Sequence, residues 1–540
     1  MSIDQDADVR GDQALALGAL AAGVSVVTGY PGAPATGVFD HLLAITEPEQ
    51  VHVQWAPNEK VAMEIAFGAS LAGSRALVVL KSVGMNIALD PLATMSLSGC
   101  HGGLVILLGD DPGGWASSNE QDSRWAARVA EVPLVEPTSV EQAASLMVQA
   151  YAWSESLGTP VIVHVTRALS LAKGRIPDPW QLPRPRKRFL RKRNRWVVLP
   201  ALVVRRHHSM HRRLRQMEKM LEATPYDVNT GQGLLGVVAV GYAHTKLLQT
   251  LGDQASGFRI LGLSSSWPLP EHNMTLWLRR IRHLLVLEEG GPFVEQQIRA
   301  LAHRAKLKLE ILGKEDRVIP QEGELTQANI AKGLSKLKPG YQYEAKSADE
   351  QAMPSKVPLC DDCPYRPTFE ALLQAMERHG GRQHHVVIGE TGCMIRANLA
   401  PMELFDVKYS LGSGLGLGLG LALRDTRHHV IALLGDSSFF HSDINAMPYA
   451  VQLDPPLTVI VLDNDTTALT GGQPHTGSTT DERGRRRKHA ALVRVIRGCG
   501  IKPQLCTPDD TQAMGVAFDE AFEAEGLRVI VVRGPCPRYT

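Results

Sequence analysis

The sequence predicts an α/β protein made of doubly wound parallel sheets. Short runs of β-branched and aliphatic residues alternate with helix-length stretches along most of the 540 residues. Strands separated in this way are typical of parallel sheets with helices on both faces. The composition agrees, because 49 glycines accompany only 5% aromatic residues, as in glycine-rich α/β folds. At roughly 100–200 residues per domain, the length predicts about three domains.

Three α/β regions are expected, over residues 1–175, 236–340 and 358–540, joined by linkers over 176–235 and 341–357. Each region contains short apolar runs of the kind that become buried strands. In chain order these runs are Val24–Thr28, Ala76–Leu80, Leu104–Leu108, Val161–Val165, Val237–Val240, Ile260–Leu263, Leu284–Leu287, Val386–Ile388, Val430–Leu434, Leu457–Leu462 and Val529–Val532.

The first linker is strongly basic. Between Arg184 and Arg215 the chain has 13 Lys and Arg and no acidic residue. Such a stretch is either a nucleic-acid or anionic-surface site, with Phe189 and Trp196 available for stacking, or a solvated connector. We favour the connector and expect no nucleic-acid partner, because 57 basic residues against 56 acidic ones leave a net charge of only +1.

The composition also excludes several classes of protein. No apolar run reaches the roughly 18 residues of a membrane-spanning helix, so no membrane span is expected. The first residues are acidic, unlike a signal peptide, and seven cysteines in 540 residues are too few for a disulfide scaffold. A cytoplasmic protein is therefore expected.

Polar residues follow two of the predicted strands. Gly435-Asp436-Ser437 comes after one strand and Asn464 after another, with 26 residues between the two groups. A carboxylate, an amide oxygen and the carbonyl of Thr466 would hold one Mg²⁺, which prefers oxygen ligands and completes its shell with diphosphate oxygens. This is the spacing of the thiamine-diphosphate motif. The alternative is two unrelated turns.

A glycine-rich run, Gly412–Gly420, precedes this motif. Alternating glycines often reflect tight helix packing, but before a diphosphate site they would also let a helix approach the cofactor closely. Gly412 and Gly414 are therefore candidate cofactor contacts. A close cysteine pair, Cys360-x-x-Cys363, is compatible with zinc, redox or iron–sulfur chemistry.

Several segments together resemble the alpha subunits of the indolepyruvate:ferredoxin oxidoreductases, within the thiamine-diphosphate-dependent 2-oxoacid:ferredoxin oxidoreductases. The likeness runs from about Gly11 to the end of the chain. Its motifs are Tyr30–Pro34, Asn58–Ala62, Asp90-Pro91, Ser117–Asp122, Leu287–Gly290, Pro292–Glu295, Gly435–Ser442 and Leu462–His475.

The resemblance implies the roles of the three regions. Residues 1–175 would be a pyrimidine-binding domain, 236–340 a transketolase C-terminal-like domain, and 358–540 the diphosphate and Mg²⁺ domain. The cofactor would lie at an interface, usually between subunits, so a dimer of this large subunit is expected. A smaller partner subunit, coenzyme A, and ferredoxin or another electron acceptor would complete the system.

The resemblance also implies a catalytic carboxylate. Glu59 matches the family's activating acid, which hydrogen-bonds the aminopyrimidine ring so that its imino nitrogen deprotonates the thiazolium. Glu64 is the competitor one helical turn further on. His441 and His475 are candidate proton carriers. The remaining expected cofactor contacts are Tyr30, Pro31, Gly32, Ser437, Ser438, Leu469 and Thr470.

The superfamily often holds a [4Fe–4S] cluster on four cysteines, and Cys360, Cys363, Cys393 and Cys536 match their spacing. Two features depart from the family. The chain shows no ferredoxin-like domain at its C-terminal end, and Ala33 stands where a Thr is common. The expected activity is oxidative decarboxylation of a 2-oxoacid, indolepyruvate or another arylpyruvate, to an acyl-CoA. The alternatives are a non-oxidative thiamine-diphosphate decarboxylase or acyl-transferring lyase, and a non-enzymatic scaffold.

Overall fold

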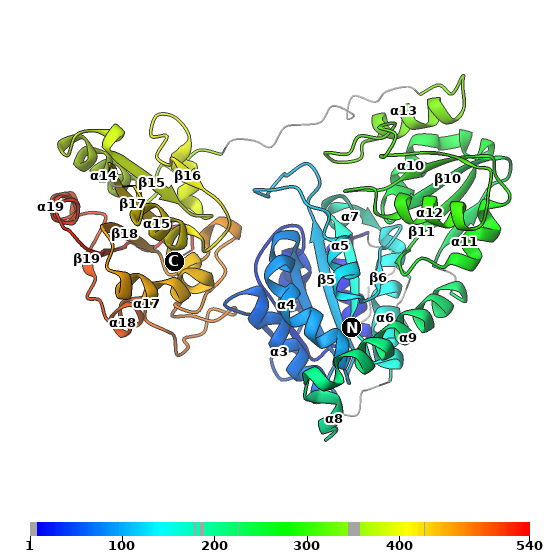
Figure 1. Ribbon diagram of the computed structural model, residues 1–540, viewed down its shortest axis with the longest axis horizontal. Helices are drawn as coiled ribbons and strands as arrows, with labels where there is room; N and C mark the ends of the chain where they lie inside the picture. Colours follow the sequence, from blue (N-terminus) through cyan, green and yellow to red (C-terminus); the bar gives the residue numbers. More distant parts are fainter. Residues whose placement is uncertain are drawn as a thin grey trace. The chain divides into compact units, whose positions relative to one another are not determined.

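The computed structural model describes residues 8–177, 180–183, 188–224, 226–343, 357–425 and 427–539. It consists of two compact units (Figure 1), one formed by Met1–Gln54 with Glu59–Pro354 and the other by Trp55–Asn58 with Ser355–Thr540. The predicted linker 341–357 lies mostly outside the described residues. Within those residues, no helix combines the length and the hydropathy needed to cross a membrane.

A seven-stranded sheet organises the N-terminal part of the first unit. Its strands are, in spatial order, β12 (Ser265–Trp267), β6 (Leu134–Val135), β7 (Val161–Thr166), β5 (Leu104–Asp110), β4 (Ala76–Lys81), β2 (Val26–Gly29) and β3 (His52–Trp55). β5 and β7 are buried along their whole length, as is typical of parallel strands covered on both faces. The four strands predicted for this region are all present.

Helices alternate with these strands along the chain. They are α1 (Gly11–Ala21), α2 (Thr36–Ile45), α3 (Glu59–Leu71), α4 (Ser82–Ser98), α5 (Arg124–Ala130), α6 (Val140–Leu157) and α7 (Arg167–Leu171), and a short pair, β1 (Val9–Arg10) with β8 (Lys173–Gly174), lies outside the sheet. The edge strand β12 comes from the middle region and pairs antiparallel with β6. The sheet therefore extends beyond the predicted 1–175 boundary, because a later segment completes its edge.

The middle region has its own five-stranded sheet. The strands are, in order, β14 (Glu310–Leu312), β13 (His283–Leu287), β10 (Leu235–Val240), β11 (Arg259–Leu263) and the antiparallel β9 (Val228–Thr230). Its helices are α10 (Ala243–Leu251), α11 (Glu271–Leu278), α12 (Phe293–Arg304) and α13 (Gln327–Leu337). Apolar clusters cover both faces of this sheet, which is the doubly wound arrangement that the sequence predicts.

The second unit is built on a six-stranded parallel sheet. Its order is β16 (Val407–Lys408), β15 (His385–Gly389), β17 (His429–Gly435), β18 (Leu457–Asp463), β20 (Arg528–Arg533) and β19 (Gln504–Cys506). Its helices are α14 (Arg366–Arg378), α15 (Gly414–Ala422), α16 (Asp436–Ser438), α17 (Ile444–Leu453), α18 (Leu492–Gly498) and α19 (Thr511–Phe522). α14 and α19 pack on one face of the sheet, and α15, α17 and α18 pack on the other (Figure 1).

The stretch 176–235, predicted as a linker, contains a long helix. After the short α8 (Arg193–Trp196), α9 spans Val203–Glu222. The helix forms in spite of its charge because one face carries Met210, Met217 and Leu221, all buried. The connector interpretation missed this face, since charged residues separate its apolar residues in the sequence.

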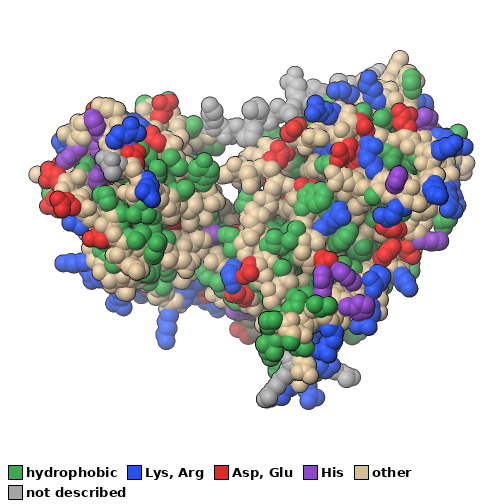
Figure 2. Space-filling model, in the orientation of Figure 1, with side chains coloured by type: hydrophobic (Ala, Val, Ile, Leu, Met, Phe, Trp, Pro, Cys, Tyr) green, Lys and Arg blue, Asp and Glu red, His purple; other side chains and the backbone are tan. Residues whose placement is uncertain are grey.

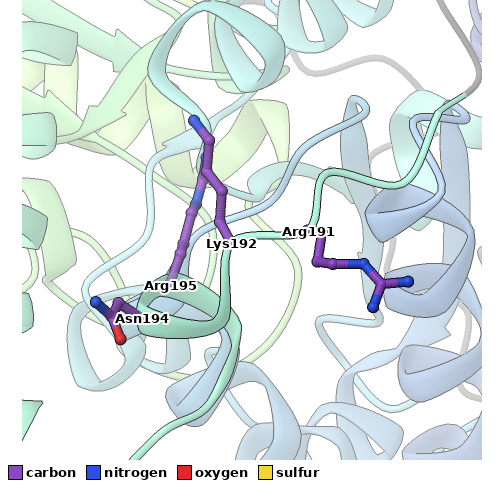
Figure 3. A pocket seen from close by; sticks show the side chains of 4 residues that line it. All are labelled: Arg191, Lys192, Asn194 and Arg195. Atoms are coloured by element: carbon purple, nitrogen blue, oxygen red, sulfur yellow. The ribbon is translucent and has the colours of Figure 1, made fainter.

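Two basic side chains of this stretch cap the end of α4. Arg195 donates to the carbonyls of Ser98 and Cys100 at 3.0 and 2.5 Å, and Arg213 donates to Ser96. Cations near a helix C-terminus satisfy its last carbonyls and its dipole. Arg195 also lines a shallow pocket with Arg191, Lys192 and Asn194; in Figure 3 the Arg191 side chain extends away from the other three.

Buried charges join the first sheet to the middle region. His164 on β7 lies between two carboxylates, with Nε2 3.1 Å from Asp110 and Nδ1 2.9 Å from Glu136. Arg124, the first residue of α5, donates to Asp122 and Glu288 at 2.8 and 2.9 Å. It also donates to the carbonyls of Glu289 and Gly291. Two of the family-like motifs, Ser117–Asp122 and Leu287–Gly290, therefore meet in an ionic network.

The network predicts a pH dependence of stability. Burial alone would lower the pKa of His164, but the two flanking carboxylates outweigh it and raise the pKa from 6.5 to about 10. A raised native pKa stabilises the fold fully below pH 6.5, and this stabilisation is lost as the pH rises through 10. The free energy of unfolding should therefore fall between these values, by at most about 1.4 kcal/mol per pH unit from this residue.

Urea denaturation between pH 6.5 and 10 measures this effect. In His164→Gln the free energy of unfolding should fall less steeply with pH than in the unsubstituted protein. His303→Gln, at an exposed helical position, should leave this pH dependence unchanged. Equal slopes for the protein and for His164→Gln would contradict a charged His164 in the folded state.

Candidate functional site

The carboxyl ends of β17 and β18 bring Asp436 and Asn464 together. The two strands are parallel neighbours, with Gly435 paired to Leu462. Asp436 is only 3% exposed. Its Oδ2 accepts hydrogen bonds from the backbone N–H groups of Asn464 and Asp465, at 2.9 and 2.8 Å. Ligands in open α/β sheets bind at this edge of the strands, so the predicted motif occupies a binding position.

The oxygen atoms of this edge fit a hard divalent cation. Beside the Asp436 carboxylate, the side-chain oxygen of Asn464 accepts from the N–H of Thr466 at 3.1 Å, which folds the chain back over the strand end. Asp465 between them has a φ of +64°, a left-handed conformation that tightens this turn. A carboxylate, an amide oxygen and a backbone carbonyl are the donors that Mg²⁺ prefers.

His475 supports the Asp436 carboxylate. Its Nε2 lies 3.1 Å from Asp436 Oδ2, and its ring stacks on Phe440 with centroids 5.7 Å apart. The other ring nitrogen accepts from the N–H of Gly477 at 3.1 Å, so the proton belongs on Nε2. Burial alone would lower the pKa of His475, but Asp436 raises it overall. The structure therefore places His475 against the candidate metal ligand Asp436. The role of His475 as a proton carrier stays a prediction.

His441 lies in a single π-helical turn, Phe439–Asp443, that follows α16. The side chain is buried, and its Nδ1 lies 2.8 Å from the Ser442 hydroxyl. Turns of this kind occur frequently at functional sites. The structure therefore buries His441 within a π-helical turn, and its role as a proton carrier stays a prediction.

Further polar side chains of the loops after β17 and β18 hydrogen-bond within and between these loops. The hydroxyls of Ser437 and Thr467 are 3.0 Å apart, and Ser438 Oγ accepts from the Gly435 N–H at 3.0 Å. Thr470 bonds the Gln473 side chain at 2.6 Å. The loop after Asn464 is therefore closed on itself and tied to the loop after β17.

The N-terminus of α15 faces a buried carboxylate. Glu390, directly after β15, accepts from the N–H groups of Gly412 and Gly414, and Asp443 accepts from that of Leu415 at 3.0 Å. A Cβ at Gly414 would come within 2.6 Å of Leu434 and 2.9 Å of Glu390, so a larger residue there would have to displace these side chains. Burial, reinforced by Glu390, raises the pKa of Asp443 to about 8. The backbone N–H groups of Gly412 and Gly414, two predicted cofactor contacts, therefore donate to Glu390 in this structure.

The four predicted cysteines line one pocket in the second unit. Cys360, Cys363, Cys393 and Cys536 come from the segment before α14, the segment after β15 and the segment after β20, and all four thiols are half-buried. Asn464 and Leu469 of the loop after β18 line the same pocket. The structure therefore unites four residues that are up to 176 positions apart in sequence.

The thiol geometry separates the three interpretations of the cysteine pair. A tetrahedral zinc site would need sulfurs about 3.8 Å apart, but within the described residues no three of these sulfurs lie within 4.8 Å of one another. A redox-active pair has a lowered thiol pKa, whereas burial raises the pKa of Cys363, and that of Cys393 to about 11. The Arg396 guanidinium lies 3.6 Å from Cys360 Sγ. The four thiols beside this cation stay compatible with an iron–sulfur cluster, which binds cysteines as thiolates.

In the first unit, the two candidate glutamates differ in burial. Glu59 is the first residue of α3 and is only 6% exposed. Its carboxylate packs against Gly84 of α4, where a Cβ would come within 2.4 Å of Oε1. Glu64 is 45% exposed and pairs with Lys60 on the helix surface. Burial at the end of the sheet favours Glu59 as the functional acid.

Tyr30, Pro31 and Gly32 follow β2 at the same edge of this sheet. The N–H of Gly32 donates to Thr36 Oγ1 at 2.7 Å, which fixes the start of α2. A Cβ at Gly32 would come within 2.8 Å of Lys81, whose amine donates to the carbonyl of Ala116. These residues therefore lie with Glu59 at the carboxyl ends of neighbouring strands, where the sequence places a binding site.

Sequence reasoning missed three polar residues of the second unit, namely Glu390, Asp443 and Arg396. Glu390 had a signal, because it follows a predicted strand and immediately precedes the Thr391-Gly392-Cys393 segment. Asp443 and Arg396 had none, since their roles depend on partners 28 and 36 residues away.

Two family comparisons cover the two ends of the chain. Residues 17–198 match the family described as pyruvate flavodoxin/ferredoxin oxidoreductase, thiamine diP-bdg. Residues 391–532 match the family described as thiamine pyrophosphate enzyme, C-terminal TPP binding domain. The first match contains Glu59 and Gly32, and the second contains Asp436 and Asn464.

Two relatives match almost the whole of this chain. The indolepyruvate oxidoreductase subunit IorA of Archaeoglobus fulgidus is 32% identical over 97% of this chain and 86% of that protein. The same subunit of Methanothermobacter thermautotrophicus is 30% identical over 97% and 86%. A solved 2-oxoglutarate:ferredoxin oxidoreductase from Magnetococcus marinus matches the fold with a TM-score of 0.50, at 16% identity over 61% of this chain and 65% of that chain.

Proposed function

Because this chain belongs to the family of indolepyruvate oxidoreductase IorA subunits, we propose that it decarboxylates an arylpyruvate oxidatively and forms an acyl-CoA. Membership in this family makes the chain a thiamine-diphosphate-dependent oxidoreductase of the 2-oxoacid:ferredoxin class. The observation that carries the oxidative reaction is the pocket that four cysteines share with Asn464 and Leu469.

Asp436, Asn464 and the carbonyl of Thr466 are the ligands we assign to Mg²⁺, which would hold the cofactor's diphosphate. Two backbone N–H groups already orient the Asp436 carboxylate, so binding requires little rearrangement of this chain. Thiamine diphosphate supplies an electron sink that stabilises the negative charge left by loss of CO₂. The chain must orient the substrate and manage protons around that centre.

Glu59 is the residue we assign to proton management at the pyrimidine. Its buried position at the start of α3 keeps bulk water from competing for the carboxylate. A carboxylate positioned in this way increases the basicity of the group it hydrogen-bonds. His441 is the second proton carrier in this proposal, and His475 holds Asp436 in place.

The reaction balances with coenzyme A and an electron acceptor. The bond between C1 and C2 of the 2-oxoacid breaks, a C–S bond to coenzyme A forms, and CO₂, one proton and two electrons leave. The four cysteines would hold a [4Fe–4S] cluster, which accepts electrons one at a time. Ferredoxin or a partner subunit would take them onward. We also propose a partner subunit, as the subunit name of the relatives suggests. We expect this partner to be the smaller subunit and the present chain to form a homodimeric core.

Anaerobic purification followed by iron, acid-labile sulfide and thiamine-diphosphate analysis tests this proposal. We expect about four irons and one thiamine diphosphate per chain. Cys393→Ser should lose the iron and retain the cofactor, and it should also lose 2-oxoacid-dependent reduction of an acceptor.

The matched control is Cys499→Ser, because Cys499 is half-buried but does not line the four-cysteine pocket. It should keep its iron. Thiamine diphosphate without iron in the unsubstituted protein would contradict the cluster and favour non-oxidative chemistry. Absence of both after incubation with Mg²⁺ and cofactor would overturn the whole proposal.

A further inference from the structure

Three potential metal ligands converge in the first unit, on the opposite end of α5 from the ionic network. His207 and His211 lie one turn apart on α9, and Glu131 follows the last residue of α5. Glu131 Oε2 is 2.5 Å from His207 Nε2, and Oε1 is 3.0 Å from His211 Nε2. On the face drawn in Figure 2, histidine side chains gather beside α9.

The arrangement follows from helix geometry. Residues four apart on a helix lie on the same face, and the two imidazole rings are 4.3 Å apart between centroids. Each carboxylate oxygen therefore faces a different ring. The three ligand atoms lie within 4.8 Å of one another, the one such group of His, Cys, Asp and Glu in the part of the chain that the structure describes.

We propose that Glu131, His207 and His211 bind one divalent transition-metal ion of the Zn²⁺ class. Imidazole nitrogens bind zinc at about 2.0–2.1 Å and carboxylate oxygens at about 2.0–2.2 Å. Small side-chain rotations from the present separations place a metal between the three groups. Two imidazoles and a carboxylate suit zinc, copper and nickel better than magnesium or calcium.

The site lies at the surface and is built by two separate elements. Glu131 is 27% exposed, and the two histidines are 47% and 43% exposed, so an ion has access from solvent. Glu131 adopts a left-handed φ of 52° while its N–H closes the end of α5 on the carbonyls of Ala127 and Arg128. The residue that ends α5 is therefore the one whose carboxylate contacts α9.

A metal ion there would fasten α9 to the end of α5. The same α5 begins at Arg124, which anchors the ionic network. Zinc should therefore stabilise the first unit by holding the basic helix in place, and the ion has no part in the proposed decarboxylation. Three protein ligands leave one coordination position for water.

Equilibrium dialysis of the full-length protein against Zn²⁺, with metal counted by mass spectrometry, tests the site. The protein with both His207→Ala and His211→Ala should bind one Zn²⁺ fewer per chain than the unsubstituted protein. His208→Ala is the matched control, because it removes an exposed neighbouring histidine from a different face of α9. It should bind as much as the unsubstituted protein.

Co²⁺ distinguishes this site from the cysteine pocket. Cobalt bound by imidazole and carboxylate gives visible d–d bands without the intense sulfur charge-transfer absorption of a thiolate site, and the double substitution should remove these bands. The proposal would be overturned if the double variant bound as much zinc as the unsubstituted protein. It would also be overturned if the absorption lost in the double variant included the sulfur charge-transfer bands of a thiolate site. A second variant, Glu131→Gln, should weaken zinc binding while leaving iron content and 2-oxoacid oxidation unchanged, so failure here is distinguishable from failure of the proposed function.

Discussion

Glu59→Gln should lower kcat for 2-oxoacid oxidation by about 10²–10⁴-fold, the usual contribution of a positioned acid–base group. The amide has nearly the shape of the carboxylate, so packing against Gly84 is retained. Thiamine-diphosphate and iron contents should therefore stay unchanged. A loss confined to kcat would identify Glu59 as a group that acts in the chemical step.

Glu64→Gln is the matched control, one helical turn away on α3. Its carboxylate is 45% exposed and pairs only at the surface with Lys60, and such pairs contribute little to stability. We expect wild-type turnover. If the two variants lost activity equally, the choice of Glu59 over Glu64 would be wrong. Hydrogen exchange at thiazolium C2, followed by proton NMR, would show whether the defect in Glu59→Gln lies in proton removal.

Fold class followed from the sequence because buried parallel strands are apolar throughout. Runs such as Leu104–Leu108 and Leu457–Leu462 need no alternation, and each became a strand within two residues of its expected ends. The short edge strands were missed for the opposite reason. β12, for example, is Ser265–Trp267, and its polar sequence gives no periodic signal.

The candidate site was predictable where its residues follow strands. Asp436 and Asn464 occupy the carboxyl ends of neighbouring strands, and topology alone places them together. The contacts around those residues were not predictable. Glu390 follows a predicted strand, but its hydrogen bonds to the N-terminus of α15 could not be inferred from that position. The contact of His475 with Asp436 is made through a loop. Tertiary folding sets such contacts, and neither periodicity nor spacing encodes them.

The basic stretch shows the same limit. The positive charge of the stretch was evident from the sequence, but the groups that its arginines contact were not. Arg195 and Arg213 cap α4, whose carbonyls could not be identified as their partners from sequence. Likewise, His207 and His211 had a helical spacing, but Glu131 lies 76 residues before the first of them.

Replacement of Arg124 is expected to have the largest effect on stability. The side chain is only 1% exposed, and it donates to two carboxylates and two backbone carbonyls from both parts of the first unit. Its removal would leave Asp122 and Glu288 buried without a compensating charge. Breaking a buried ion pair on one side is costly, because the remaining partner keeps its desolvation penalty.

Arg124→Met should therefore lower the free energy of unfolding by about 3–5 kcal/mol, measured by urea denaturation with tryptophan fluorescence. Arg128→Met on the same helix is the control. Arg128 stacks on Trp125 and Trp267 at 5.5 and 5.0 Å, contacts worth roughly 0.5–1 kcal/mol at a partly exposed site. The deficit of Arg124→Met should shrink as the pH falls from 8 to 5, since protonation relieves the unpaired carboxylates. A pH-independent deficit would mean that lost packing, and not lost charge, destabilises the variant.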